Sequence, residues 1–287
     1  MTAHATARDI RLPTFVHIGP GKTGSTWLHE VLSLHPDVYL TPAKDLYFFS
    51  RYYGRGIDWY RAQFAAAPRE VRVIGEVCPD YLLSRDAAPR IREVLGPDVK
   101  LMVTLRDPVE RAFSSYLYAA KHGLAEPTFR ATLDAQPEII QEGRYATQLR
   151  HYVDAVGTAS IRVGIFDDFT SNPQAFLDGT TEWLGVAPMA LSDEQLAAQL
   201  PASRARFVPL AKVAKVMAGW VRNHDGTNFV GRVKRARVVQ RLLYAPLGTD
   251  RPAIPEADVA YLREIFEPEI AAVEAEFGLP LRERWRW

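Results

Sequence analysis

The feature that most constrains this chain is a glycine-rich turn between a predicted strand and a predicted helix, within residues 15–28. The β-branched and aromatic run Phe15–Ile18 predicts a buried strand. The turn then brings three glycines and one lysine close together: Gly19, Gly21, Lys22 and Gly24. Ser25 and Thr26 open a segment in which apolar residues recur with helical spacing. This order places a helix N-terminus directly after a strand end.

Such a turn forms a cradle for an anion. The first amide N–H groups of a helix lack partners within the helix, and the helix dipole favours negative charge there. Glycine lets the backbone approach closely, Lys22 adds a positive charge, and the hydroxyl groups donate hydrogen bonds. The ATP-binding Walker motif requires a glycine where this chain has Val16, so the cradle has room for fewer phosphate groups. The alternative is a glycine-rich turn that binds no ligand.

Predicted strands and helices alternate along the chain. The candidate strands are Thr14–Gly19, Val38–Leu40, Val71–Gly75, Lys100–Leu105 and Ser160–Phe166. The candidate helices are Ser25–Leu34, Arg85–Leu95, Pro108–Lys121, Arg144–Val156, Pro173–Leu184, Val208–Val221 and Pro255–Phe277. This alternation predicts an α/β fold with a parallel β-sheet flanked by helices on both faces, and ligands at the carboxyl ends of the strands.

Composition narrows the class of protein. The chain has 287 residues, 47% of them hydrophobic and 24% charged, as expected of a globular protein. Its net charge of +1 gives no argument for nucleic acid as a partner. The single cysteine, Cys78, excludes an intramolecular disulfide. Neither a signal peptide nor a membrane-spanning segment is expected, so the sequence predicts a cytoplasmic protein and leaves the oligomeric state open.

We expect one domain over residues 1–287, with a disordered N-terminal tail over about residues 1–12 and a helical, basic cap region over about residues 204–251. A basic cluster within that cap consists of Arg232, Lys234, Arg235 and Arg237. The cluster has two interpretations, a loop that covers a bound phosphate or a solvated helix face.

A second candidate anion site follows the fourth predicted strand. Arg106 ends that strand, Asp107 fits a helix N-cap, and Pro108 fits the first helical position. Ser114 lies about two turns into the helix, so Arg106 and Ser114 could hold one anion. The alternatives are an ion-pair role for Arg106 and a packing role for Ser114.

Together the two sites resemble the sulfotransferases that use 3′-phosphoadenosine 5′-phosphosulfate, whose fold is P-loop-NTPase-like. The segment Pro20–Leu28 resembles their 5′-phosphosulfate loop, and Arg106 with Ser114 resembles their 3′-phosphate pair. The resemblance implies that Lys22 contacts the oxygen that bridges phosphorus and sulfur, and that Trp27 stacks on adenine, with core packing as the alternative for Trp27. The residues that it implies for the nucleotide cradle are Gly21, Lys22, Thr23, Gly24, Ser25 and Thr26.

Further segments resemble the heparan-sulfate-type branch of that family. They include Lys44–Phe49, Gly56–Tyr60, Gly75–Leu82 and Gly143–Tyr145. In the branch, an acidic residue before the Phe-Phe pair is the catalytic base, usually glutamate. Asp45 occupies that place here, with Glu76 as its replacement candidate and with an ion pair to Lys44 as the alternative role for Asp45.

The same resemblance assigns an acceptor-binding group to Glu76, Tyr81, Tyr145 and Gln148. Two positions depart from the branch. Val77 replaces a frequent lysine, and Gln148 stands where a histidine can occur. Both departures weaken the prediction that the acceptor is heparan sulfate itself.

The predicted reaction is a direct in-line transfer of the sulfuryl group to a hydroxyl or amine of a glycan or small-molecule acceptor. The nucleotide product would be adenosine 3′,5′-bisphosphate. We expect no metal, because the seven histidines show no close-spaced ligand pattern. Two alternatives are a nucleotide kinase or hydrolase with a variant phosphate loop and a non-catalytic nucleotide-binding protein.

Overall fold

The computed structural model describes residues 10–197, 203–205, 244–246 and 252–287. The chain divides into two compact units. The first consists of Met1–Leu105 and Gln148–Gln199, and the second of Arg106–Thr147 and Leu200–Trp287. That both units belong to one domain stays a prediction.

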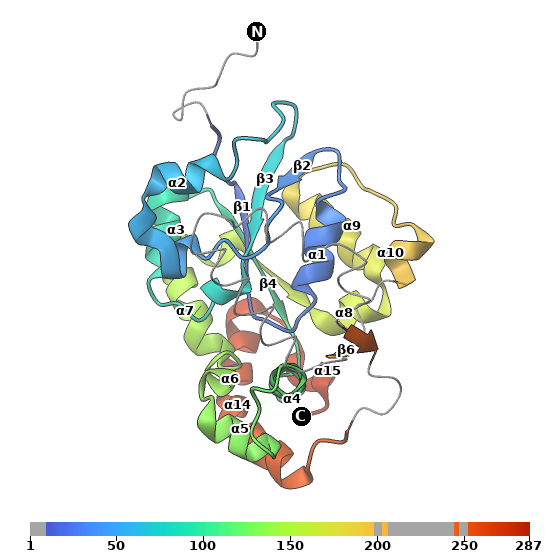
Figure 1. Ribbon diagram of the computed structural model, residues 1–287. Coiled ribbons are helices and arrows are strands. Elements are labelled where there is room, and N and C mark those ends of the chain that lie inside the picture. Colours follow the sequence, from blue (N-terminus) through green and yellow to red (C-terminus); the bar gives the residue numbers. More distant parts are fainter. Residues whose placement is uncertain (1–9, 198–202, 206–243, 247–251) are drawn as a thin grey trace. The chain divides into compact units, whose positions relative to one another are not determined.

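A five-stranded parallel sheet forms the centre of the first unit (Figure 1). Its strands are β1 (Phe15–Gly19), β2 (Val38–Leu40), β3 (Val73–Val77), β4 (Lys100–Leu105) and β5 (Ile161–Ile165). They lie in the order β2-β3-β1-β4-β5, and all four neighbouring pairs are parallel. The order reverses at β1, because the chain runs from β1 outward to β2 and later crosses to β4. In α/β sheets, ligands bind where the strand order reverses. The parallel pairing of all five strands confirms the predicted parallel sheet.

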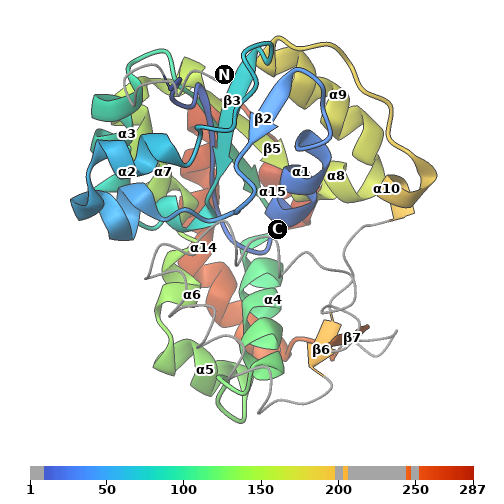
Figure 2. The same cartoon turned by 45° about the horizontal axis from the view of Figure 1, so that its top comes forward.

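Helices cover both faces of this sheet (Figures 1 and 2). On one face lie α1 (Ser25–Leu32), α8 (Phe166–Ser171) and α9 (Pro173–Leu184), with α10 (Asp193–Ala197) beside them. On the other face lie α2 (Ile57–Ala62), α3 (Ala87–Leu95) and α7 (Tyr145–Val156). Shorter turns are η2 (Phe48–Tyr52), η3 (Tyr53–Arg55), η4 (Pro79–Tyr81) and η5 (Thr158–Ser160).

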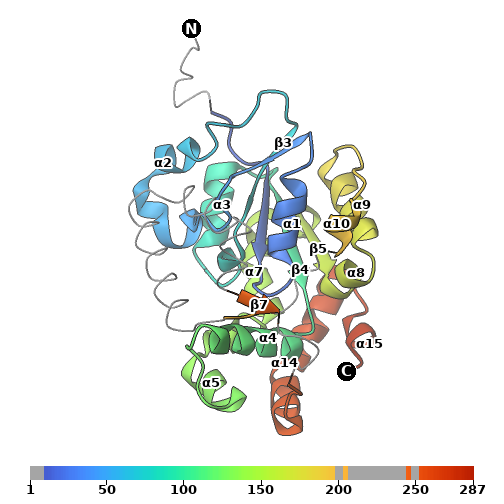
Figure 3. The same cartoon turned by 45° about the vertical axis from the view of Figure 1, so that its right-hand side comes forward.

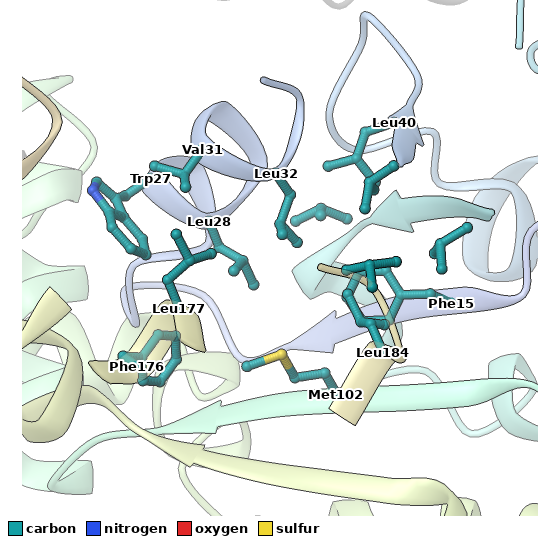
Figure 4. Close-up of a cluster of buried hydrophobic side chains, with 14 of the residues drawn as sticks. Phe15, Trp27, Leu28, Val31, Leu32, Leu40, Met102, Phe176, Leu177 and Leu184 are labelled. Carbon is teal, nitrogen blue, oxygen red and sulfur yellow. The ribbon is translucent and has the colours of Figure 1, made fainter. Parts of the chain in front are cut away.

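The core between α1, α9 and the sheet fixes the position of α1 (Figure 4). Trp27, Leu28, Val31 and Leu32 form the buried stripe of α1. They pack with Phe15 of β1, Met102 of β4 and the α9 side chains Phe176 and Leu177. A fully buried side chain of this size contributes roughly 1.5–3 kcal/mol to folding. The N-terminus of α1 is therefore held firmly where β1 ends.

The second unit is mostly helical. Its elements are α4 (Pro108–Lys121), α5 (Phe129–Ala135), α6 (Glu138–Gln141), α14 (Glu256–Phe277), α15 (Leu281–Trp285) and the antiparallel pair β6 (Ser203–Ala205) and β7 (Tyr244–Pro246). Figure 3 shows α4 beside α14. The buried Arg111 of α4 pairs with Glu142 at 2.6 Å between Nη1 and Oε2. Gly143 leaves room for α14, since a Cβ there would lie 2.7 Å from the Phe266 ring.

One predicted strand has the wrong bounds. The strand expected at Val71–Gly75 is β3 at Val73–Val77, because pairing with β2 begins at Val38 and Val73. Glu76 consequently lies inside the strand, and not beyond its end. Sequence patterns also missed short helices, among them α2, α5 and α8, because six or seven residues show little periodicity.

Several predictions concern residues that the structure does not describe. The helix expected at residues 208–221, the basic cluster at Arg232–Arg237 and most of the cap region lie outside the described residues. So do residues 1–9 of the expected tail. Arg11 in the same tail donates hydrogen bonds to the carbonyl oxygens of Val71 and Pro68. No helix in the described ranges is both long enough and apolar enough to cross a bilayer.

Candidate active site

The turn between β1 and α1 requires glycine at two places. A Cβ on Gly19 would lie 2.4 Å from the carbonyl oxygen of Pro79. Gly24 adopts a left-handed φ of 85°, and a Cβ there would lie 2.9 Å from the Phe169 ring. Glycine meets both demands at no steric cost, so the motif follows from the geometry of the turn.

Gly24 is also the N-cap of α1 and supplies no side-chain hydrogen bond to the first turn. The amide groups that open α1 are therefore not capped by this residue, and they form an anion-binding end of the helix. Nearby, the buried Thr23 hydroxyl donates to the Pro20 carbonyl at 2.8 Å. Ser25 is buried at the start of α1, whereas Thr26 is exposed. The residues of this turn fit the phosphate cradle that the sequence predicts.

Lys22 and Asp45 share an unusual backbone conformation. Their φ angles are 70° and 66°, in the left-handed region. Among the described residues, only Tyr47 and Arg286 join them as non-glycine residues with positive φ. Lysine in this region is strained by roughly 1–2 kcal/mol, whereas aspartate and asparagine adopt it more readily. Sparsely populated backbone conformations gather at functional sites, and here they fall on the two residues predicted to be catalytic.

Asp45 lies at the carboxyl end of β3. Its backbone N–H donates to the Val77 carbonyl at 3.0 Å. The Lys44 ammonium lies 3.1 Å from its carboxylate, and the two side chains are 21% and 26% exposed. The alternative interpretation predicted this ion pair, and such partly exposed pairs stabilise by about 1 kcal/mol or less. The carboxylate remains accessible, next to the strand that leads into the Lys22 turn.

Glu76 is the centre of a buried hydrogen-bond network. Its carboxyl group accepts from the Tyr60 hydroxyl at 2.7 Å and from the Tyr81 hydroxyl at 2.6 Å. Burial raises the pKa of Glu76 to about 7, and the nearby charge of Asp45 adds to the shift. Burial also raises the pKa of both tyrosines. Because Glu76 and Tyr81 have no exposed surface, the network indicates a structural role, and direct acceptor contact by either residue stays a prediction.

Sequence reasoning missed His17. This histidine is wholly buried in β1, and its Nε2 lies 3.1 Å from the Thr104 hydroxyl of β4. Burial is the main cause that lowers its pKa to about 3, and the charge of Lys44 lowers it further. His17 is therefore neutral at pH 7. The only signal in the sequence was a histidine within an apolar strand.

Trp27 lies in the core, as its alternative interpretation predicted. Its side chain is 2% exposed and contacts Phe169, with ring centroids 4.6 Å apart. The indole N–H donates to the Gln195 carbonyl at 3.2 Å. These contacts hold α1 against α8 and α10, whereas stacking on adenine stays a prediction.

In the second unit, the start of α4 matches the sequence interpretation. The Asp107 carboxylate caps α4 by accepting from the amides of Val109 and Glu110 at 2.8 and 3.1 Å. The Arg106 guanidinium pairs with Glu110 at 3.3 Å, and Ser114 is partly exposed on the helix. The ion pair is the role that the alternative interpretation gave to Arg106.

Two further contacts hold the start of α4, one to the backbone of Arg106 and one to the side chain of Asp107. The Tyr145 hydroxyl donates to the Arg106 carbonyl at 2.7 Å, and the Trp287 indole donates to Asp107 at 2.8 Å. Tyr145 is wholly buried, so this contact indicates that it supports α4. Gln148, which belongs to the first unit, is also buried. Acceptor binding by these two residues stays a prediction.

Within the part of the chain that the structure describes, no group of three or more His, Cys, Asp or Glu side chains is arranged to hold a metal ion.

Comparison with known proteins identifies the family. Residues 13–227 match the family model described as the sulfotransferase domain. Heparan sulfate glucosamine 3-O-sulfotransferase 6 of Homo sapiens is 28% identical over 268 residues, which cover 90% of this chain and 70% of that protein. The bifunctional heparan sulfate N-deacetylase/N-sulfotransferase 2 of Homo sapiens is 29% identical over 205 residues, which cover 62% of this chain and 22% of that protein.

A solved structure supports the same fold. The crystal structure of a sulfotransferase from Alicyclobacillus acidocaldarius matches with a TM-score of 0.70 at 24% identity, covering 97% of this chain and 100% of that one. Sulfotransferases have a P-loop-NTPase-like fold, so this match confirms the predicted fold class. The kinase and non-catalytic alternatives are not favoured. Because the family model covers most of its length, this chain belongs to the sulfotransferase family, the enzymes that transfer sulfuryl groups.

Proposed function

We propose that the enzyme transfers a sulfuryl group from 3′-phosphoadenosine 5′-phosphosulfate directly to a hydroxyl or amine of a glycan or small-molecule acceptor. One observation carries this proposal. A lysine-bearing anion cradle opens α1 at the end of β1, and a partly exposed carboxylate, Asp45, lies at the end of the neighbouring strand β3. The cradle supplies groups for an anionic donor, and the carboxylate supplies a base for the acceptor.

The cradle residues have separate roles in donor binding. The amide groups at the start of α1 bind the 5′-phosphate, together with the Thr26 hydroxyl. The absence of a side chain on Gly24 lets the phosphate approach the backbone. Lys22 lies on the turn before α1 and contacts the oxygen that bridges phosphorus and sulfur. Since Trp27 is buried in the core, we leave it out of the proposed nucleotide contacts.

Two side chains carry the chemistry. Asp45 accepts the proton of the acceptor group as the bond from acceptor to sulfur forms. As the bond from sulfur to the bridging oxygen breaks, Lys22 stabilises the negative charge that develops on that oxygen. Positioned bases typically contribute about 10²–10⁴-fold to rate, and one preorganised electrostatic group contributes about 10²–10³-fold. No sulfated enzyme intermediate is required.

On α4, we propose that Arg106 and Ser114 bind the 3′-phosphate. Arg106 follows the last residue of β4 and pairs with Glu110. A phosphate would therefore compete with the Glu110 carboxylate for the guanidinium, which recognises phosphate better than a point charge does. The proposal rests on residue type and spacing.

The relatives support a sugar acceptor, since their names describe heparan sulfate 3-O-sulfation and N-sulfation. They disagree on whether oxygen or nitrogen is sulfated, so we propose a glycan or small molecule that offers either group. Val77 and Gln148 differ from the heparan-sulfate-type branch and leave the acceptor open.

The experiment is incubation with isotopically labelled donor and a panel of glycans, amines and phenols, read by mass spectrometry. Sulfated product and adenosine 3′,5′-bisphosphate should appear in equal amounts. The variant Lys22→Ala is the control, and added chelator tests the expectation that no metal is needed. Tighter binding of ATP with magnesium than of adenosine 3′,5′-bisphosphate, without sulfated product, would contradict the proposal.

A further inference from the structure

The buried carboxyl group of Glu76 connects to the turn that carries Asp45. Besides the two tyrosine hydroxyls, Glu76 accepts a hydrogen bond from the backbone N–H of Leu46. Leu46 is itself wholly buried and directly follows Asp45. Glu76 therefore holds the backbone one residue away from the proposed base.

That backbone is strained on both sides of Leu46. Asp45 and Tyr47 have φ angles of 66° and 56°, so two left-handed residues flank the bonded amide. A strained turn persists only where its surroundings fix it. The buried Glu76 carboxyl group fixes this strained turn at the Leu46 amide.

Ring contacts hold the two tyrosines that donate to Glu76. The Tyr60 ring stacks on Phe48 with centroids 4.4 Å apart and an interplanar angle of 12°. The Tyr81 ring packs edge-on against Phe49 at 5.4 Å. Phe48 and Phe49 begin η2, directly after the Asp45 turn. Glu76 thus joins the sheet, the Asp45 turn and the aromatic cluster that follows it.

We propose that Glu76 is a positioning residue, which holds the strained Asp45 turn in its reactive conformation through the Leu46 amide and the Tyr60 and Tyr81 hydroxyls. This inference rests on the proposed function, in which Asp45 is the base. In this role Glu76 acts through the Asp45 turn and not through contact with the acceptor, which fits its wholly buried side chain.

The charge of Glu76 determines how well it can hold the Asp45 turn in place. An ionised carboxylate accepts all three hydrogen bonds, whereas a protonated one must itself donate a proton. Since the pKa of Glu76 is raised to about 7, positioning should improve as the pH rises through neutrality. The titratable groups around Glu76 are Asp45 and Lys44 on the turn, Tyr60 on α2, Tyr81 on η4, Cys78 after β3 and His17 on β1.

The test compares Glu76→Gln with the wild-type enzyme and with the exposed control Glu70→Gln. Glu76→Gln should lower kcat by roughly 10–10²-fold, since a misplaced group about 1 Å from its position costs up to about 10²-fold. Its dissociation constant for adenosine 3′,5′-bisphosphate should stay unchanged. The wild-type and Glu70→Gln profiles of kcat should rise near pH 7, and that rise should be lost in Glu76→Gln.

Tyr60→Phe and Tyr81→Phe keep the proposal testable if Glu76→Gln fails to fold. Each removes one donor, so each should lower kcat with nucleotide affinity unchanged. Suppose that those of Glu76→Gln, Tyr60→Phe and Tyr81→Phe that fold keep the wild-type kcat and the wild-type pH profile. That result would overturn the positioning role. Asp45→Asn separates the two proposals. If Asp45→Asn is inactive and Glu76→Gln is fully active, the positioning role of Glu76 is wrong and the proposed base stands. If Asp45→Asn is active, both the proposed base and the positioning role are wrong.

Discussion

At the scale of single residues, Lys22 and Asp45 should differ in what they contribute. Asp45→Asn keeps the shape of the side chain and removes the proposed base, so turnover should fall by about 10²-fold or more. Its nucleotide affinity should stay nearly intact. Lys22→Ala should lower turnover and also weaken donor binding, because in the proposed mechanism the ammonium contacts the nucleotide before reaction. Steady-state kinetics and titration calorimetry on both variants measure the difference.

The opposite pattern would reassign the roles. Full activity in Asp45→Asn would remove Asp45 from the mechanism. A binding defect in Asp45→Asn but not in Lys22→Ala would show that the carboxylate, and not the ammonium, contacts the donor in the ground state.

Glu76 and His17 should have opposing effects on the pH dependence of folding. The pKa of Glu76 rises from 4.5 to about 7, so the folded protein keeps a proton that the unfolded chain releases. Glu76 therefore lowers the free energy of unfolding as pH rises between these values, by about 3 kcal/mol in all. The pKa of His17 falls from 6.5 to about 3, so His17 stabilises the fold as pH rises through that window.

Thermal unfolding from pH 4 to 8 tests this balance. Glu76→Gln removes the Glu76 contribution, so its melting temperature should gain on the wild type as pH rises from about 4.5 to about 7. Glu70→Gln, an exposed control, should follow the wild type. Parallel curves for wild type and Glu76→Gln would show that the carboxyl group has no raised pKa.

At the scale of elements, the first turn of α4 should decide recognition of the 3′-phosphate. Arg106→Ala should weaken binding of adenosine 3′,5′-bisphosphate, because it removes both charge and hydrogen bonds. Arg106→Lys should weaken it less, since it keeps the charge but loses the planar guanidinium. Binding of AMP, which lacks the 3′-phosphate, should change in neither variant. Wild-type affinity of Arg106→Ala for the bisphosphate would contradict the assignment.

Elements with strong local signals could be predicted from the sequence. Lys100–Leu105, Pro108–Lys121 and Pro173–Leu184 have the bounds that apolar runs, capping residues and proline indicated. The anion cradle could also be predicted, because its glycines, its lysine and the start of its helix lie within a few residues of one another in the sequence. β3 was placed two residues early, since its bounds depend on pairing with β2.

The buried network could not be predicted in this way. Tyr60 and Glu76 are 16 residues apart, and His17 and Thr104 are 87 apart, so their contacts exist only once the sheet has formed. The family resemblance assigned Glu76 and Tyr81 to acceptor binding, and the strand expected at Val71–Gly75 ended before both of them. The strand in the structure includes Glu76 and buries it, which a sequence motif alone does not reveal.

At the scale of the whole molecule, the nucleotide product should stabilise the fold. Adenosine 3′,5′-bisphosphate at about 100 times its dissociation constant should add roughly 2.7 kcal/mol to the free energy of unfolding. A chain of 287 residues should then melt several degrees higher, at about 2–4 °C per kcal/mol. AMP should produce a smaller shift in the same thermal assay. Equal shifts from the two nucleotides would argue against a site for the 3′-phosphate.

The left-handed backbone at Lys22 and Asp45 has a consequence for protein engineering. Glycine relieves this conformation, and asparagine tolerates it well, so Lys22→Gly and Asp45→Asn should fold at least as well as the parent. A directed-evolution library sorted for heat resistance alone would enrich such replacements and discard the two side chains that we propose to be catalytic. Gains in melting temperature at these two positions should therefore accompany lost turnover, and a thermostable variant should be sought with both residues held fixed.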